Sequence, residues 1–433
     1  MNKQIGADIR MEITPMADYA AKFSSVMAGN DLPDLVQIPA YFRLPRLPDL
    51  LHSRFADLSD HLSGDKVRTY PNLANLPTVS WRNARIAGRI FGVPLARPTF
   101  AQPMLYRADI FAEAGLQPPQ SAADFTALCK ELTNEKAGRW ALGSYANNGF
   151  GMDYVAQMFG VPRKWHKKAD GTLVRSVETE EYMEALAYMR GLWKAGYFHP
   201  DSASASTVQA KELFAGGRFV MYTDGLPAWR AAYSDYVPQN PGMKVMALDA
   251  CPAEPGGKVV QYAERGVFSI TAIKKADTGR VEELLRILDF LAAPFGSREW
   301  QVRANGVENV DYTRQKNGSL EPTDQGKREL TTPFSFIMDG PPSLYHPRYT
   351  EWVQAQHAWE TRAARHSVAD PTIGIYSETE ARQGDLEQLL SESSTSIITG
   401  RSSVASFKDT LRQWQERGGN KIRTELEEGL RRQ

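Results

Sequence analysis

The chain has 433 residues, more than one hydrophobic core usually supports, so its length predicts two lobes. Its 51 basic side chains are balanced by 51 acidic ones, and a chain without a basic excess lacks the charge that holds a nucleic-acid backbone. Hydrophobic residues make up 42% of the sequence, but none of their runs reaches the roughly 18 residues of a membrane-spanning helix.

The first predicted elements alternate between helix and strand. Apolar side chains at helical spacing predict a helix over 14–27 that ends at Gly29, and the apolar run 35–38 predicts a buried strand after it. Residues 7–13 alternate between apolar and polar side chains, which predicts a further strand ahead of the helix.

Helix signals recur along the rest of the chain. Ser121 is the predicted N-cap of a helix through Leu132, and Thr179 is the predicted N-cap of a helix that stops at Gly196. An apolar stripe predicts another helix over 281–291. Strands that alternate with such helices imply an α/β fold with a largely parallel sheet covered on both faces. Two amphipathic faces near the C-terminus are predicted to dock on the second lobe: Phe407, Leu411 and Trp414, and then Ile422, Leu426 and Leu430.

The segment 214–229 carries the most informative local pattern. A helix ends at two glycines, a short apolar strand follows, and the strand leads into a turn with Asp224 and then Trp229. Open α/β sheets bind their ligands at such strand ends. A carboxylate beside an indole suits a sugar, which offers hydroxyl groups and an apolar ring face. The alternative is an ordinary strand and turn whose Trp229 fills the core.

Catalytic and metal-binding motifs are missing from the sequence. It has no G-x-S-x-G elbow, no H-E-x-x-H pair, no phosphate-binding loop and no dinucleotide fingerprint. Its seven histidines never occur four residues apart, and Cys129 and Cys251 are its only cysteines, so we predict neither a metal nor a cofactor. Cys129 is interpreted as a small buried hydrophobic residue. A pair of carboxylates for glycoside hydrolysis stays open, because the acidic residues allow many pairings.

Four segments, in order, resemble motifs of the extracellular solute-binding proteins of ABC sugar importers. The resemblance implies a two-lobe, periplasmic-binding-protein-like α/β fold in which a hinge closes an interlobe cleft over the ligand. It also implies a monomer that is not an enzyme and that passes a carbohydrate to an ABC permease. The segments read MAGNDLPDLV at 27–36, YRADIFAEAGL at 106–116, GLWKAGYFHPD at 191–201 and FAGGRFVMYTDG at 214–225, and the likeness continues at 397–400 and 414–419.

The resemblance also suggests where the chain crosses between lobes. The run at 104–106 would leave the first sheet, the run at 264–270 would lead back, and the polar stretch 317–324 is either a third crossing or a surface loop. The resulting division assigns 1–105 and 266–325 to lobe 1, and 106–265 and 326–433 to lobe 2 with its C-terminal helices.

Loops that follow strands at the cleft are the predicted ligand contacts. Aromatic faces would stack on sugar rings, and charged or amide groups would hydrogen-bond to hydroxyls. The alternative for each charged residue is a solvated ion pair at the cleft rim. The candidate ligand-binding residues are Tyr41, Phe42, Arg97, Asn147, Asn148, Phe150, Asp224, Trp229, Glu264 and Arg265.

We therefore expect a carbohydrate-binding component of an ABC importer, with an oligosaccharide as its ligand. The alternatives are a sugar-active hydrolase and a sugar sensor without a transport role. The family resemblance implies an extracellular or periplasmic lipoprotein, yet the sequence opens without a charged n-region and an apolar h-region. We expect that an export signal and a first strand precede the sequence given, because the helix at 14–27 needs a strand on each side.

Overall fold

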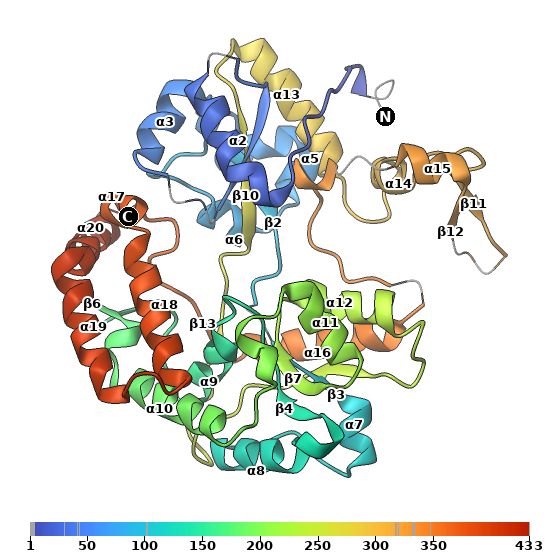
Figure 1. Ribbon diagram of the computed structural model, residues 1–433. Helices are drawn as coiled ribbons and strands as arrows, with labels where there is room; N and C mark the ends of the chain where they lie inside the picture. Colours follow the sequence, from blue (N-terminus) through green and yellow to red (C-terminus); the bar gives the residue numbers. More distant parts are fainter. Residues whose placement is uncertain are drawn as a thin grey trace.

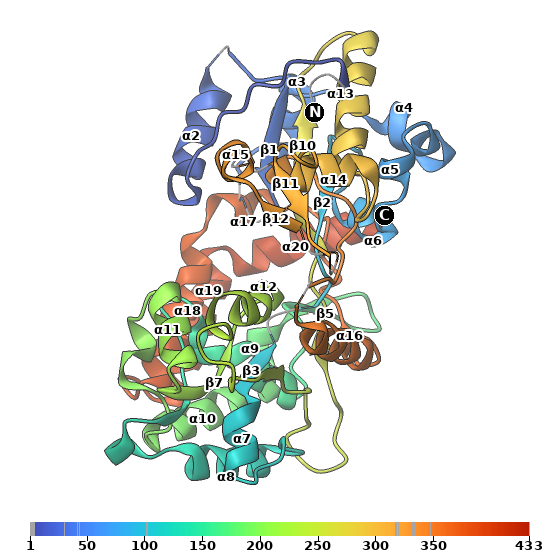
Figure 2. The same cartoon turned by 90° about the vertical axis from the view of Figure 1, so that its right-hand side faces the viewer.

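The computed structural model describes residues 5–29, 31–40, 42, 44–100, 103–316, 318, 320–330, 334–346 and 348–432. They form two lobes, each with its own hydrophobic core (Figure 1). Lobe 1 comprises the described residues of 5–96 and 267–338, and lobe 2 comprises those of 104–262 and 344–432. Figure 2 shows the C-terminal helices α17 and α20 at the level where the two lobes face each other.

Lobe 1 is built on a three-stranded sheet in the order β1-β10-β2, and both pairings are antiparallel. One core cluster joins this sheet to α2 and α3 through side chains such as Phe23 and Leu51, and a second joins it to α13. The elements of lobe 1 are α2 (Met16–Ala28), β1 (Leu35–Pro39), α3 (Leu47–Arg54), α4 (Ser59–Leu62), α5 (Pro71–Ala74), α6 (Thr78–Asn83), β2 (Gly92–Ala96), β10 (Val267–Ile273), α13 (Thr278–Leu291), α14 (Arg298–Asn305), β11 (Tyr312–Arg314), β12 (Leu320–Pro322) and α15 (Asp324–Glu329).

Lobe 2 contains a four-stranded sheet in the order β4-β7-β3-β8, in which only β4 and β7 run parallel. Its strands are β3 (Met104–Arg107), β4 (Trp140–Leu142), β5 (Trp165–Lys167), β6 (Leu173–Arg175), β7 (Phe219–Thr223), β8 (Val245–Ala247), β9 (Gln261–Tyr262) and β13 (Ser367–Val368). Its helices are α7 (Ala108–Glu113), α8 (Ala122–Leu132), α9 (Met152–Met158), α10 (Glu180–Lys194), α11 (Thr207–Ala215), α12 (Leu226–Ala231), α16 (Thr350–Ala364), α17 (Glu378–Arg382), α18 (Asp385–Ile398), α19 (Phe407–Trp414) and α20 (Asn420–Arg431).

The expectation of largely parallel sheets is wrong. β2 runs out of lobe 1 toward lobe 2, whereas β10 enters lobe 1 from lobe 2 beside it, so the two strands must run in opposite directions. The backbone N–H of Arg97 continues this pairing by donating to the Gly266 carbonyl at 3.0 Å. Helix-strand alternation along the sequence therefore did not report strand direction, because the chain changes lobe between neighbouring strands.

The helix ends follow their predicted caps. The Ser121 side chain accepts from the Asp124 N–H at the start of α8, and Thr179 accepts from Tyr182 at the start of α10. The predicted strand at 7–13 is wrong, because these residues form no strand. Ile9 and its apolar neighbours pack against the lobe 1 core instead.

The third passage between the lobes lies later than predicted. The described residues of the stretch 317–324 belong to the β11–β12 hairpin and the start of α15, which project from lobe 1 (Figure 1). Met338 is still fully buried in the lobe 1 core, and Leu344 is the first residue to pack against lobe 2. The chain passes close to lobe 1 on the way, since a Cβ at Gly340 would lie 2.7 Å from the Ala293 carbonyl oxygen. The lobe 1 portion therefore extends past the predicted boundary at 325.

The C-terminal helices pack on lobe 2 as predicted. Phe407, Trp414, Ile422 and Leu426 are buried in the same core as α8, α9 and α10. Cys129 is buried there as well, and it forms no disulfide. Among the helices in the described ranges, none is long and apolar enough to cross a membrane.

Candidate functional site

A cavity of about 450 Å³ lies in lobe 2 where the chain leaves for lobe 1 at its second crossing. Residues 263–265 of this crossing form part of its wall. The rest comes from four other stretches: 149–164, which contains α9; 175–182, from β6 to α10; Asp370 with Ile373; and 387–398 of α18. Five stretches that are far apart in the sequence therefore meet at one point beside the hinge.

Arg163 organises the charges of this cavity. One of its guanidinium nitrogens lies 2.8 Å from Asp153, and another pairs with Glu264. The guanidinium carbon lies 5.0 Å from the centre of the Tyr262 ring. Burial raises the pKa of the Glu264 carboxyl, although the positive charge of Arg163 acts in the opposite direction. Arg163 thus fixes both carboxylates as oriented hydrogen-bond acceptors.

Two further ion pairs lie at the wall. Lys164 lies 3.0 Å from Glu380, and Arg175 lies 2.6 Å from Glu387. The Arg175 Nε is buried and has no hydrogen-bond partner in the described part of the chain. A buried donor of this kind is costly unless a ligand or water completes its hydrogen bonds.

Hydroxyl groups occupy the side formed by α10 and α18. The Tyr182 hydroxyl lies 2.9 Å from Ser394 Oγ, and Ser391 and Thr395 line the same wall. Burial raises the pKa of Tyr182 to about 12, so its proton stays in place at neutral pH. The cavity therefore combines fixed acceptors, neutral hydroxyls and aromatic edges, the groups that recognise a polyhydroxylated ligand.

Two of the predicted ligand-binding residues, Glu264 and Arg265, line this cavity. The loop before α9 lies at its edge through Gly149. Asn147 in this loop is exposed and has a left-handed backbone with φ 65°, whereas the Asn148 amide donates to the backbone and the side chain of Thr223 at 2.9 and 3.1 Å. Asn148 thereby ties the loop to the end of β7.

Asp224 keeps an unused acceptor at the end of β7. Its Oδ1 accepts from the Gly225 N–H at 2.7 Å, and its buried Oδ2 has no hydrogen-bond partner among the described residues. Burial raises the pKa of the Asp224 carboxyl. Burial and then the nearby charge of Asp224 raise the pKa of Tyr145 to about 12.

The two aromatic residues predicted beside this strand end are core residues. Trp229 is 0% exposed, and its indole N–H donates to the Val245 carbonyl at 2.9 Å. Phe150 is also buried, and its ring lies 5.1 Å from Trp193 and 5.8 Å from Phe198. Their ring faces pack inside lobe 2, so neither is free to stack on a sugar. The prediction was wrong for both because a helical turn and a left-handed residue direct these side chains inward.

The predicted residues of lobe 1 lie on the other side of the crossings. The Arg97 guanidinium sits 4.9 Å from the centre of the Phe268 ring, and no carboxylate of the described chain lies within ion-pair distance of it. Phe42 packs in the lobe 1 core, with its ring 5.7 Å from that of Phe23. Tyr41 lies outside the described residues.

The sequence interpretation missed most of the cavity wall. Arg163, Lys164 and Arg175 lie in or beside the small β5–β6 hairpin, and the hydroxyl residues of α18 are more than 200 positions away. The run Arg163-Lys164 after Pro162 was the available local signal, since two cations at the start of a short strand predict an anchoring point for acidic groups.

Comparison with known proteins shows which family this chain resembles. The model of the bacterial extracellular solute-binding proteins matches residues 1–286. The chain belongs to that family. Lipoprotein LipO of Bacillus subtilis is similar to this solute-binding protein, with 22% identity over 98% of the chain and 87% of LipO. The polygalacturonan/rhamnogalacturonan-binding protein YtcQ of the same bacterium shares 21% identity over 100% of the chain and 87% of YtcQ.

A solved structure shares the fold of this solute-binding protein. The HMO-binding, ABC-transporter-associated solute-binding protein of Bifidobacterium longum infantis superposes with a TM-score of 0.70, at 11% identity, over 99% of this chain and 93% of the other. The predicted periplasmic-binding-protein-like fold with two lobes is therefore confirmed.

Proposed function

We propose that this solute-binding protein captures an oligosaccharide at the cavity beside its second crossing and delivers it to the permease of an ABC importer. The observation that carries the proposal is the position of Glu264 and Arg265, which belong both to the cavity wall and to the segment that joins the lobes. A ligand held there would contact the hinge itself, so binding and lobe closure would be coupled through shared residues.

The chemistry of the cavity supports a sugar ligand. Its acidic groups are held by cations, so they are oriented to accept hydrogen bonds from hydroxyls without demanding a charged ligand. Tyr182 and Tyr262 add aromatic edges next to these acceptors. The named ligands of two similar proteins, a polygalacturonan/rhamnogalacturonan and HMO, agree with this class.

Uronate-containing oligosaccharides are the sharper candidate. Arg97, close to the first crossing, forms no ion pair within 4 Å among the described residues, although the charge of Asp339 reaches it, and such a guanidinium can pair with a ligand carboxylate. We propose that Asp224 and the loop at 147–148 contact the same ligand from lobe 2. We propose that the ligand is released unchanged, since the family is one of solute-binding proteins and Arg163 already engages both Asp153 and Glu264.

The family supports an extracellular protein, and we propose a monomer tethered as a lipoprotein that works with permease subunits. Calorimetry with a panel of short galacturonate, alginate and neutral oligosaccharides tests the ligand class, with chromatography of the recovered sugar in the same samples. We expect micromolar or tighter binding of at least one member and an intact sugar afterwards.

Arg163→Gln should weaken that binding, and Lys327→Gln is the matched control because Lys327 is an exposed residue on the projecting part of lobe 1. No heat and no thermal shift with any member of the panel would count against a sugar ligand. Shortened products would favour the hydrolase instead.

A further inference from the structure

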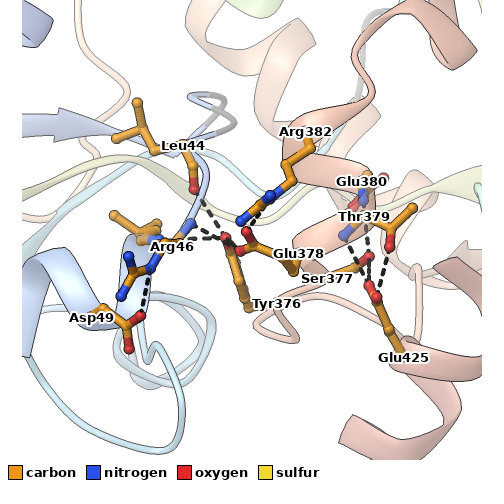
Figure 3. A network of polar contacts seen from close by, with 11 residues as sticks. Leu44, Arg46, Asp49, Tyr376, Ser377, Glu378, Thr379, Glu380, Arg382 and Glu425 are labelled. Carbon is orange, nitrogen blue, oxygen red and sulfur yellow. Dashed lines mark hydrogen bonds and ion pairs between the residues drawn. The ribbon is translucent and has the colours of Figure 1, made fainter.

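A segment of lobe 2 reaches across to lobe 1 at a place separate from the three crossings. Residues 370–382, here called the strap, begin at the cavity wall with Asp370 and end in α17. Figure 3 shows Tyr376 and Glu378 of the strap meeting the chain at Leu44 and Arg46, just before α3. The strap thus touches both the cavity and the opposite lobe.

Among the described residues, Leu44, Arg46 and Leu47 of lobe 1 meet the strap through backbone groups. The Tyr376 hydroxyl, which can donate to the Leu44 carbonyl at 3.1 Å or to Glu378 at 2.5 Å, accepts from the Leu47 N–H at 3.4 Å. The Arg46 N–H donates to Glu378 Oε2 at 2.9 Å. Because these bonds reach main-chain atoms of lobe 1, they depend on where that part of the backbone lies.

These bonds replace a cap that α3 lacks. Arg46 is the N-cap residue with a left-handed φ of 54°, and its side chain forms no capping hydrogen bond. Asp49 stands at the third helical position, from which an acidic side chain can accept from the N-cap N–H. Its carboxylate is bound instead to Arg46 Nε at 3.0 Å, and the N-cap N–H goes to Glu378.

The charge of Glu378 suits this place. A carboxylate at a helix N-terminus is stabilised by the helix dipole. The hydrogen bond from Tyr376 and then the one from the Arg46 N–H lower the pKa of Glu378 to about 2, so it stays charged at physiological pH. The strap therefore supplies to α3 the acceptor that its own sequence does not.

The other end of the strap is held firmly by lobe 2. Glu425 on α20 accepts from Ser377 Oγ at 2.5 Å and from the Thr379 N–H and hydroxyl at 3.0 and 2.7 Å. Lys164 of the cavity wall lies 3.0 Å from Glu380. The strap is part of the lobe 2 chain and is bound to that lobe through Glu425 and Lys164 as well, so it moves with lobe 2, and the bonds to α3 are the ones that separate.

We propose that the strap caps α3 from the opposite lobe, holds the two lobes together over the cavity, and releases α3 each time the lobes open. The latched and released states are two populations of the same chain, and the interlobe hydrogen bonds set their ratio. This holds whatever ligand occupies the cavity, so it stands apart from the proposed function.

Single-molecule energy transfer in the ligand-free protein tests the proposal. Dyes on Asp60→Cys in lobe 1 and Val208→Cys in lobe 2 report the interlobe distance, and the native Cys129 and Cys251 are buried. Tyr376→Phe and Glu378→Gln should each lower the ratio of short-distance to long-distance molecules about fivefold, the effect of losing one net hydrogen bond. Amide exchange at Arg46 and Leu47 should accelerate in both variants.

Asp49→Asn is the matched control, because it changes a neighbouring carboxylate whose ion pair stays within lobe 1. It should leave the distance distribution unchanged. Glu378 is partly exposed, so Glu378→Gln should fold normally. This variant therefore tests the proposal even if Tyr376→Phe folds poorly. Wild-type distances and wild-type amide exchange in folded Glu378→Gln would overturn the proposal.

Discussion

The end of β7 and the cavity at the second crossing contain similar residue types, aromatic rings beside charged groups, but their side chains have different surroundings. At the end of β7 a short local segment places Trp229 in the core and leaves the Asp224 carboxylate buried with one unused acceptor. At the cavity, residues from distant segments pair their charges around Arg163. The comparison teaches that the local segment with Trp229 contributes to the hydrophobic core, whereas the polar cavity is formed by tertiary contacts between distant segments.

The largest effect should come from Trp229→Ala. Removal of a fully buried indole with a hydrogen bond to Val245 should lower the free energy of unfolding by about 3–5 kcal/mol. Denaturant titration measures this loss. Calorimetry under conditions where the variant is folded should give an unchanged affinity for the oligosaccharide. A loss of affinity without a loss of stability would show instead that Trp229 contacts the ligand.

Arg163→Gln should have the next largest effect, and on the opposite region. Loss of its charge leaves Asp153 and Glu264 without their common cation, which should weaken binding by about 1–2 kcal/mol after allowance for solvent screening. Calorimetry with the sugar selected from the panel measures it. Arg280→Gln removes a comparable double ion pair on lobe 1 and should leave affinity unchanged; equal losses in both variants would contradict a special role for the cavity.

Asp224→Asn should reveal a pH dependence at the end of β7. Burial raises the pKa of this carboxyl in the folded state, so the folded protein holds the proton more tightly than the unfolded chain does. Stability from this group is present below its ordinary pKa and is lost as the pH rises through the raised value. Urea unfolding of both proteins from acid to neutral pH should therefore show the variant becoming more stable relative to wild type as the pH rises. A constant difference across this range would show that the carboxyl does not titrate as described.

Arg97→Gln should have the smallest and most selective effect. Its guanidinium forms no ion pair in the described chain, so its loss should change stability little. Binding of a galacturonate oligosaccharide should weaken by about 1 kcal/mol, while a neutral oligosaccharide should bind as before. Parallel titrations of the two sugars make the measurement, and equal weakening of both would remove Arg97 from the recognition of acidic groups.

The sequence predicted the local elements well because their signals are local. The N-caps Ser121 and Thr179, the apolar stripe of α13 and the buried faces of α19 and α20 each follow from spacing within one segment. The predictions of parallel strands and of a strand at 7–13 were wrong, because the partners with which a strand pairs come from another part of the chain.

The candidate site divides in the same way. Glu264 and Arg265 could be named from sequence because they lie in a segment whose resemblance marks a crossing. Arg163, Arg175 and the hydroxyls of α18 could not, since nothing within their own segments shows that they face one cavity. Trp229 shows the converse, because only packing decides whether an indole turns toward solvent or toward the core.

The sequence by itself determined the family, the two-lobe fold and the bounds of several helices, because motif order, apolar spacing and capping residues are properties of contiguous chain. Tertiary structure alone decided which lobe holds residues 334–338, which charges pair around Arg163, and that α3 receives its cap from Glu378 of the other lobe. The physical reason is that an ion pair between residues 101 positions apart, or a cap between residues 332 positions apart, depends on where the folded chain brings them, and no local spacing encodes that contact.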